Sequence, residues 1–146
     1  MKIKLIVRGA CILLGGVKGH TENIEIISIV DRFLEHARIL VFHNGGQERY
    51  YMSSADWMER NLTHRIETTY PVYDPDLQKE IRELLDLQLN DNVKARTIDR
   101  YNTNEYRRSA SDIPVRAQIE TYFYYKRKLE NTAAGALPSA SPAADH

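Results

Sequence analysis

One histidine and one arginine stand close together where two secondary-structure elements are expected to meet. His36 is followed two positions later by Arg38. A neutral imidazole can accept or donate a proton near pH 7, and an imidazolium can stabilise negative charge on a phosphoryl group. Arginine adds a permanent charge with donors that fit phosphate oxygens. The pair suits chemistry on phosphate, although a lone histidine is more often a structural or solvent-exposed residue.

A second cationic candidate is Arg8, which ends the first predicted strand and precedes Gly9. Ligands of open α/β sheets gather at the carboxyl ends of strands, and glycines allow backbone amides to approach an anion. A surface arginine that terminates an edge strand is the alternative. The glycine pairs at 15–16 and 45–46 match neither a Walker loop nor a dinucleotide-binding fingerprint.

Polar side chains concentrate in the stretch from Ser53 to Asn61. Ser54 and Asn61 can donate to phosphate, and Asp56 can orient a histidine. The alternative is an ordinary capped turn or helix start, with Ser54 or Asp56 as the N-cap.

A further strand is predicted from Arg65 to Tyr70, with Arg65 and Glu67 on one face. As an exposed cross-strand ion pair these two residues would contribute about 0–1 kcal/mol.

The elements that must position these residues follow from hydrophobic periodicity and turn signals. Asp74 followed by Pro75 predicts the start of an amphipathic helix that ends at Leu89. Two more helices are expected, a short one over 29–36 and a last one that opens at Asp112 and Pro114. The buried face of the last helix is predicted to contain Val115, Ile119, Tyr122, Phe123 and Leu129.

Strands are predicted over 2–8, 23–28, 39–42, 50–54, 65–70 and 93–98. The continuous apolar run at 39–42 is typical of a central strand covered on both faces. Strands that alternate with helices indicate an α/β or α+β fold.

Composition limits the class of protein further. The 146 residues suit one domain, and the equal numbers of basic and acidic residues, 20 of each, provide no net field to attract nucleic acid. A single cysteine fits a reducing cytosol, and no apolar stretch approaches the roughly 20 residues that span a bilayer. We therefore expect a cytoplasmic protein without a nucleic-acid partner. The histidines have no spacing typical of a zinc site, so no metal ligand is assigned.

Several segments together resemble the C-terminal domain of bacterial polyphosphate kinase, the ATP:polyphosphate phosphotransferase. The resemblance covers roughly residues 1–130, and the alanine-rich segment 131–146 is predicted to be a disordered tail. The matching pieces are LIVRG from Leu5, ENIEIISIVDRFLEHARI from Glu22, NGG from Asn44, SSADWMERNLTHRIE from Ser53, NVKARTID from Asn92 and VRAQ from Val115.

The resemblance implies a phospholipase D-like fold, a mixed sheet flanked by helices, in which two similar halves meet at one active site. That superfamily has a His-x-Lys pair in each half, followed by a Gly-Ser-x-Asn-like segment. This chain has Arg38 in the place of the lysine and Asp56 in the place of the asparagine. These departures argue against phosphodiesterase activity rather than against the fold.

The resemblance also implies roles for individual residues. His36 matches the second active-site histidine, a general acid or phosphate contact, and Arg8 matches an arginine that contacts the phosphates of ATP. Arg65 is a further expected phosphate contact, and Arg38 a weaker one. The histidine that becomes phosphohistidine belongs to the preceding half of the catalytic core, which also holds most of the Mg²⁺ site.

The implied enzyme transfers the terminal phosphate of ATP reversibly to polyphosphate, and the isolated chain is expected to be inactive. Its expected partners are ATP or ADP, polyphosphate and the remainder of the enzyme. A homo-oligomer is expected for the full enzyme, and peripheral association with a membrane is compatible with it.

Two other functions stay open at the level of sequence. One is a stand-alone phospholipase D-like phosphodiesterase, in which a symmetric dimer supplies His36 twice. The other is a non-catalytic module that binds nucleotide or polyphosphate, or a decayed gene remnant.

Overall fold

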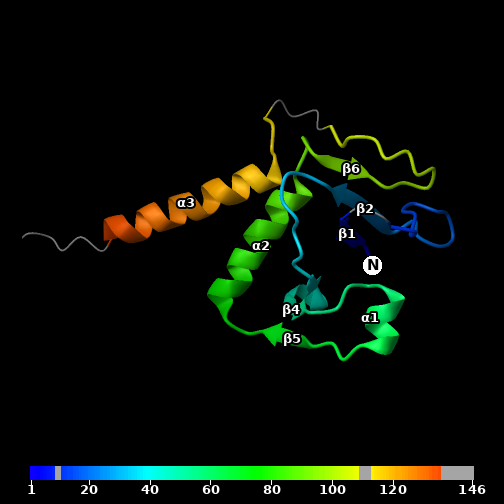
Figure 1. Cartoon of the computed structure of the whole chain (residues 1–146), viewed down its shortest axis with the longest axis horizontal. Coiled ribbons are helices and arrows are strands. Elements are labelled where there is room, and N and C mark those ends of the chain that lie inside the picture. Colours follow the sequence, from blue (N-terminus) through cyan, green and yellow to red (C-terminus); the bar gives the residue numbers. More distant parts are fainter. Residues whose placement is uncertain (9–10, 109–112, 136–146) are drawn as a thin grey trace, which may run out of the picture.

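The computed structural model describes residues 1–8, 11–108 and 113–135. A mixed three-stranded sheet occupies one end of the domain (Figure 1). Its central strand β2 (Ile24–Ile29) pairs in parallel with β1 (Ile3–Val7) and antiparallel with β6 (Ala95–Thr97). The fold class is therefore the predicted mixture of strands and helices, and Arg8 follows β1 directly, as expected.

A second, antiparallel sheet contains β3 (Ile39–Phe42), β4 (Arg49–Ser53) and β5 (Thr69–Val72), in that order. The glycine turn after β3 is a short 3₁₀ helix η1 (Asn44–Gly46), in which Gly45 and Gly46 have φ of 67° and 97°. The prediction of a central strand at 39–42 is wrong, because β3 is an edge strand that pairs only with β4 among the described strands.

Three α-helices complete the described part of the chain, α1 (Glu59–His64), α2 (Pro75–Leu89) and α3 (Ala117–Gly135). The bounds of α2 are the predicted ones, since the Asp74 carboxylate accepts hydrogen bonds from two backbone N–H groups of the first turn, at 2.8 and 3.0 Å. None of these described helices combines the length and apolar character needed to cross a membrane.

The last helix differs from its prediction at both ends. It begins at Ala117 rather than near Pro114, and Asp112 lies outside the described residues. It continues to Gly135, so the first five residues of the expected tail are helical; residues 136–146 lie outside the described part of the chain. Alanine is the strongest helix former, and the alanines near 133 extend the helix beyond the packed region.

The predicted buried face of α3 is largely exposed in this chain. Ile119, Tyr122, Phe123 and Leu129 all have exposed side chains. Figure 1 shows α3 projecting away from both sheets, with α2 beside its first turns. Tyr124 and Tyr125 hold the two helices together by donating to Glu83 and Glu80 of α2, at 2.7 and 2.8 Å. The contact is therefore made by polar tips rather than by a buried apolar stripe.

The expected helix over 29–36 is also absent; β2 extends to Ile29, and residues 30–38 form no helix or strand. Val30, Phe33 and Leu34, which have helical spacing, are exposed. The backbone N–H and C=O groups of Phe33 bond instead to the side chain of Gln118, at 3.0 and 2.8 Å. A contact from a distant part of the sequence therefore replaces the bonds that a helix would make within itself.

The predicted strand from Arg65 begins later than expected, because β5 starts at Thr69. Arg65 follows the last residue of α1 with an extended backbone, at φ −123° and ψ 153°. Arg65 and Glu67 therefore do not share a strand face.

The main core lies under the first sheet. Ile27, Ile29 and Ala95 are buried there, with Ile6 and Leu89 packed against them. Gly15 lies beside the start of β2 and the residue after β6, where a Cβ atom would stand 2.8 Å from the Ile24 carbonyl oxygen and 3.0 Å from that of Ile98. Only glycine fits this approach without a shift of the backbone.

The buried Asp91 joins the end of α2 to both β6 and α3. One carboxylate oxygen accepts from the backbone N–H groups of Val93, Lys94 and Ala95, at 2.9, 2.6 and 2.9 Å. The other accepts from the N–H of Ala117, at 2.7 Å. Asp91 is only 1% exposed, so water cannot replace these bonds.

We expect Asp91→Asn to lower the free energy of unfolding by about 1–3 kcal/mol, because the amide nitrogen cannot accept a hydrogen bond and leaves buried N–H groups unpaired. Urea unfolding followed by circular dichroism measures this loss. Asp74→Asn is the matched control, since asparagine caps an exposed helix start about as well as aspartate. Equal losses in the two variants would contradict the role of burial.

Candidate functional site

His36, Arg38 and Asp56 form a cluster at the start of the second sheet, which we call the His36 cluster. The His36 Nε2 atom lies 3.3 Å from Asp56 Oδ1, and the Arg38 Nε atom donates to the same oxygen at 2.8 Å. The Arg38 Nη2 atom lies 2.5 Å from His36 Nε2. The His36 side chain is 51% exposed and Arg38 only 24%, so the imidazole is accessible while the arginine is held beneath it.

The partners of His36 suit both of its protonation states. Arginine has donors only, so the Arg38 contact requires an unprotonated Nε2 atom that accepts. A protonated Nε2 atom instead has Asp56 Oδ1 within reach. The cluster can therefore support an imidazole that gains or loses a proton, as a general acid or base must.

The carboxylate of Asp56 is held in its charged form. The hydrogen bond from Arg38 is the largest cause that lowers the pKa of Asp56, and it also raises the pKa of Arg38. The charge of His36 lowers the pKa of Asp56 further, whereas desolvation opposes the shift. The expectation that Asp56 can orient a histidine agrees with this geometry.

Arg8 approaches the same region from the end of β1. Its Nη1 atom donates to the backbone carbonyl oxygen of Glu35 at 3.1 Å, next to His36 in the sequence. Arg8 is exposed, so the rest of its guanidinium remains accessible. The structure thus brings Arg8 to the segment that carries His36.

Ser54, Asn61 and Glu67 form a neighbouring cluster, called here the Glu67 cluster. Ser54 Oγ donates to one oxygen of Glu67, and Asn61 Nδ2 donates to the other at 2.7 Å. Both bonds lower the pKa of Glu67, and the bond from Ser54 has the larger effect. The expectation that Ser54 and Asn61 donate to phosphate is therefore not met, because an internal carboxylate accepts from both. The sequence does not identify Glu67 as this acceptor. Glu67 is six residues after Asn61, close enough along the chain for the two side chains to meet.

Arg65 and Arg38 both act on the Glu67 cluster, since their charges lower the pKa of Glu67. Arg65 is exposed beyond the end of α1. Its charge lies near the Glu67 carboxylate, and its role as a phosphate contact stays a prediction.

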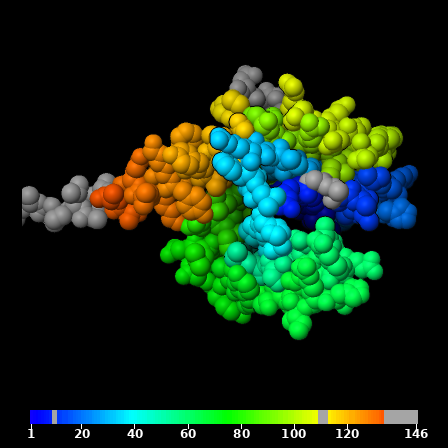
Figure 2. Space-filling view, in the orientation of Figure 1, coloured from blue at the N-terminus to red at the C-terminus, as the bar shows by residue number. Residues whose placement is uncertain are grey.

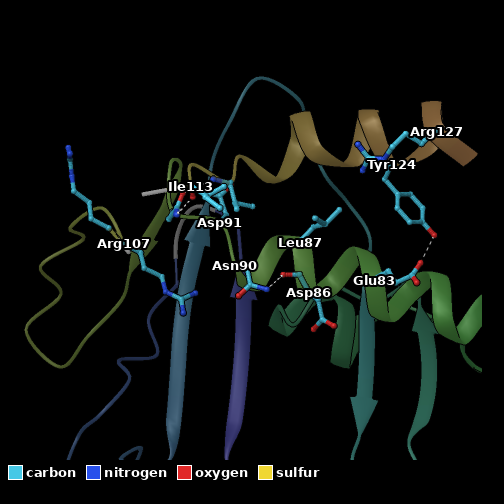
Figure 3. A pocket seen from close by; sticks show the side chains of 12 residues that line it. Glu83, Asp86, Leu87, Asn90, Asp91, Arg107, Ile113, Tyr124 and Arg127 are labelled. Atoms are coloured by element: carbon cyan, nitrogen blue, oxygen red, sulfur yellow. Dashed lines mark hydrogen bonds between the residues drawn. The ribbon is translucent and has the colours of Figure 1, made fainter. Parts of the chain in front are cut away.

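A groove of about 1060 Å³ lies elsewhere, between α2 and α3 (Figure 3). In Figure 3 Tyr124 extends from α3 toward Glu83 on α2, and Asn90 lies beside Asp86. The hydrogen bond to Glu83 raises the pKa of Tyr124 to about 12. None of the predicted site residues lines this groove. Among residues 1–8, 11–108 and 113–135, no group of three or more His, Cys, Asp or Glu side chains is arranged to hold a metal ion.

The fold and the His36 cluster define a mixed α/β domain that presents an accessible histidine among arginines. A family model described as "Polyphosphate kinase C-terminal domain 2" matches residues 1–118. The chain belongs to the family of polyphosphate kinase C-terminal domains.

Individual relatives agree with this assignment. The polyphosphate kinase of Vibrio cholerae is 49% identical over 132 residues, which are 90% of this chain and 19% of that protein. The polyphosphate kinase of Escherichia coli K12 is 45% identical over 124 residues, 85% of this chain and 18% of that protein. The crystal structure of polyphosphate kinase from Porphyromonas gingivalis has a TM-score of 0.83 at 49% identity, over 89% of this chain and 20% of that one. The chain therefore spans about one fifth of the relatives that it matches.

We expect Asp56→Asn to destabilise the domain in a pH-dependent way. Because Arg38 lowers the pKa of Asp56 in the folded state, their contact stabilises the fold above the ordinary aspartate pKa of about 4 and loses this effect as the pH falls through the lowered pKa. Urea unfolding of the wild type and the variant from pH 7 to pH 2 should therefore show a difference that shrinks below pH ~4. A difference independent of pH would contradict the charged contact.

Proposed function

We propose that this chain is the C-terminal portion of an enzyme that transfers the terminal phosphate of ATP reversibly to polyphosphate. The observation that carries the proposal is the accessible His36 held by Arg38 and Asp56, with Arg8 bound to the adjacent backbone carbonyl. Membership of the polyphosphate kinase C-terminal domain family supports the choice of substrate class.

Phosphoryl transfer depends chiefly on positioning and on stabilisation of the charge that develops on phosphate oxygens. In the proposed reaction Arg8 contacts the phosphates of ATP, and Arg65 and Arg38 add positive charge. His36 acts as a general acid or as a phosphate contact, roles that suit an imidazole side chain. Asp56 keeps the ring oriented.

The remainder of the reaction belongs to parts of the enzyme beyond this chain. We infer that a histidine of the preceding half is the nucleophile that becomes phosphohistidine, and that this half holds most of the Mg²⁺ that accompanies ATP. The isolated chain is then inactive, and polyphosphate synthesis should appear only when the preceding half is supplied. The single cysteine is compatible with action in the cytoplasm.

Equilibrium binding of ATP and of inorganic tripolyphosphate to the purified chain tests whether its part of the site is preformed. We expect Arg8→Ala to weaken binding about tenfold, the effect of one charge-assisted hydrogen bond. His36→Ala should also weaken binding, because it removes a phosphate contact. Isothermal titration calorimetry at fixed salt measures both.

Arg49→Ala is the matched control, because it removes the same charge at a different place. Arg49 is exposed at the first residue of β4, whereas Ser53 and the His36 cluster lie at the other end of this strand. An equal loss in Arg49→Ala would show that only net charge attracts the anion, which contradicts the proposed site. Hydrolysis of a model phosphodiester that disappears in His36→Ala would favour a stand-alone phosphodiesterase instead.

A further inference from the structure

Gln118, in the first turn of α3, binds a segment that has no regular structure of its own. The backbone N–H of Phe33 donates to Gln118 Oε1 at 3.0 Å, and Gln118 Nε2 donates to the carbonyl oxygen of Phe33 at 2.8 Å. The amide thus pairs with both backbone groups of one residue, as a neighbouring strand would. Residues 30–38 cross the molecular face shown in Figure 2, between the part that holds β2 and β6 and the part that holds β4 and α1.

The same amide reaches the residue next to His36. Gln118 Nε2 also lies 3.1 Å from Glu35 Oε2, and Gln88 of α2 donates to Glu35 Oε1 at 3.2 Å. The carbonyl oxygen of Glu35 is the acceptor for Arg8. Glu35 is therefore bound from α2, from α3 and from the end of β1, immediately before the histidine.

A second contact, from the residue immediately before α3, fixes the beginning of the segment. Arg116 makes a bidentate pair with Asp31, at 2.8 and 2.6 Å, and the Asp31 side chain is only 3% exposed. This pair lowers the pKa of Asp31. With Asp31 held by Arg116, the remaining freedom of the segment lies between Arg32 and His36, where Gln118 binds.

We propose that Gln118 is a positioning residue for the candidate phosphate site and sets the placement of His36 and of the carbonyl that binds Arg8. The proposal rests on the proposed function for what the site does, but its geometry does not depend on a ligand. Gln118 bonds to neither His36 nor Arg8 and acts only through Phe33 and Glu35. The role requires a side chain that both donates and accepts, which glutamine provides and glutamate or methionine does not.

The test compares the wild type with Gln118→Met, which removes all three bonds, and with Gln118→Glu, which keeps the acceptor for Phe33 N–H but loses the donor. We expect the ¹H–¹³C signals of the His36 ring to shift in both ligand-free variants, and more in Gln118→Met. The affinity for inorganic tripolyphosphate should fall by about 2- to 30-fold, the range for residues that influence a site without touching its ligand.

Gln78→Met is the matched control. Gln78 is also a half-buried glutamine in the first turn of a helix, and it donates to the carbonyl oxygen of Val72 at 2.7 Å. The Gln78→Met variant should lose a similar part of its free energy of unfolding without a shift of the His36 signals. Unchanged His36 signals in folded Gln118→Met, or in Gln118→Glu if the methionine variant does not fold, would overturn the proposal; so would an equal shift in Gln78→Met.

The experiment distinguishes failure of the positioning role of Gln118 from failure of the proposed phosphate site. Shifted His36 signals in a protein whose wild type does not bind tripolyphosphate would uphold the positioning role and count against the preformed phosphate site.

Discussion

The candidate site depends on how residues 30–38 are held between the two sheets. The segment carries a histidine and a charged neighbour, yet it has no ladder or helix of its own to fix them. Its backbone groups pair with Gln118, and Asp31 pairs with Arg116. Because α3 begins at Ala117, which Asp91 binds through its backbone N–H, the buried core and the exposed site share one junction.

Sequence could predict the elements that are determined locally. The bounds of the helix from Pro75 follow from the sequence, because Asp74 caps the helix with its own side chain. The prediction of a helix over 29–36 is wrong because the backbone of Phe33 bonds to a side chain 85 residues away. The spacing of residues within the segment gives no sign of this distant partner. The apolar residues of this segment have the spacing of an amphipathic helix, although their side chains are exposed. Tertiary contacts overrode local propensity.

The sequence indicates which residues could belong to the site more readily than it indicates the contacts between them. His36, Arg38 and Asp56 come together because β3 and β4 pair, with the Ser53 N–H bonded to the Arg38 carbonyl. The bonding of Ser54 and Asn61 does not follow from the sequence, because its pattern places Glu67 in a strand, whereas β5 begins only at Thr69. Apolar side chains of α3, among them Ile119, Phe123 and Leu129, are exposed.

In the proposed function, this chain carries a preformed part of a phosphate site around His36. The most direct measurement is the map of NMR signal changes when inorganic tripolyphosphate is added to the wild-type chain. We expect the largest changes at Arg8 and in the His36 cluster. Changes confined to the groove between α2 and α3, with the His36 ring unaffected, would contradict this expectation.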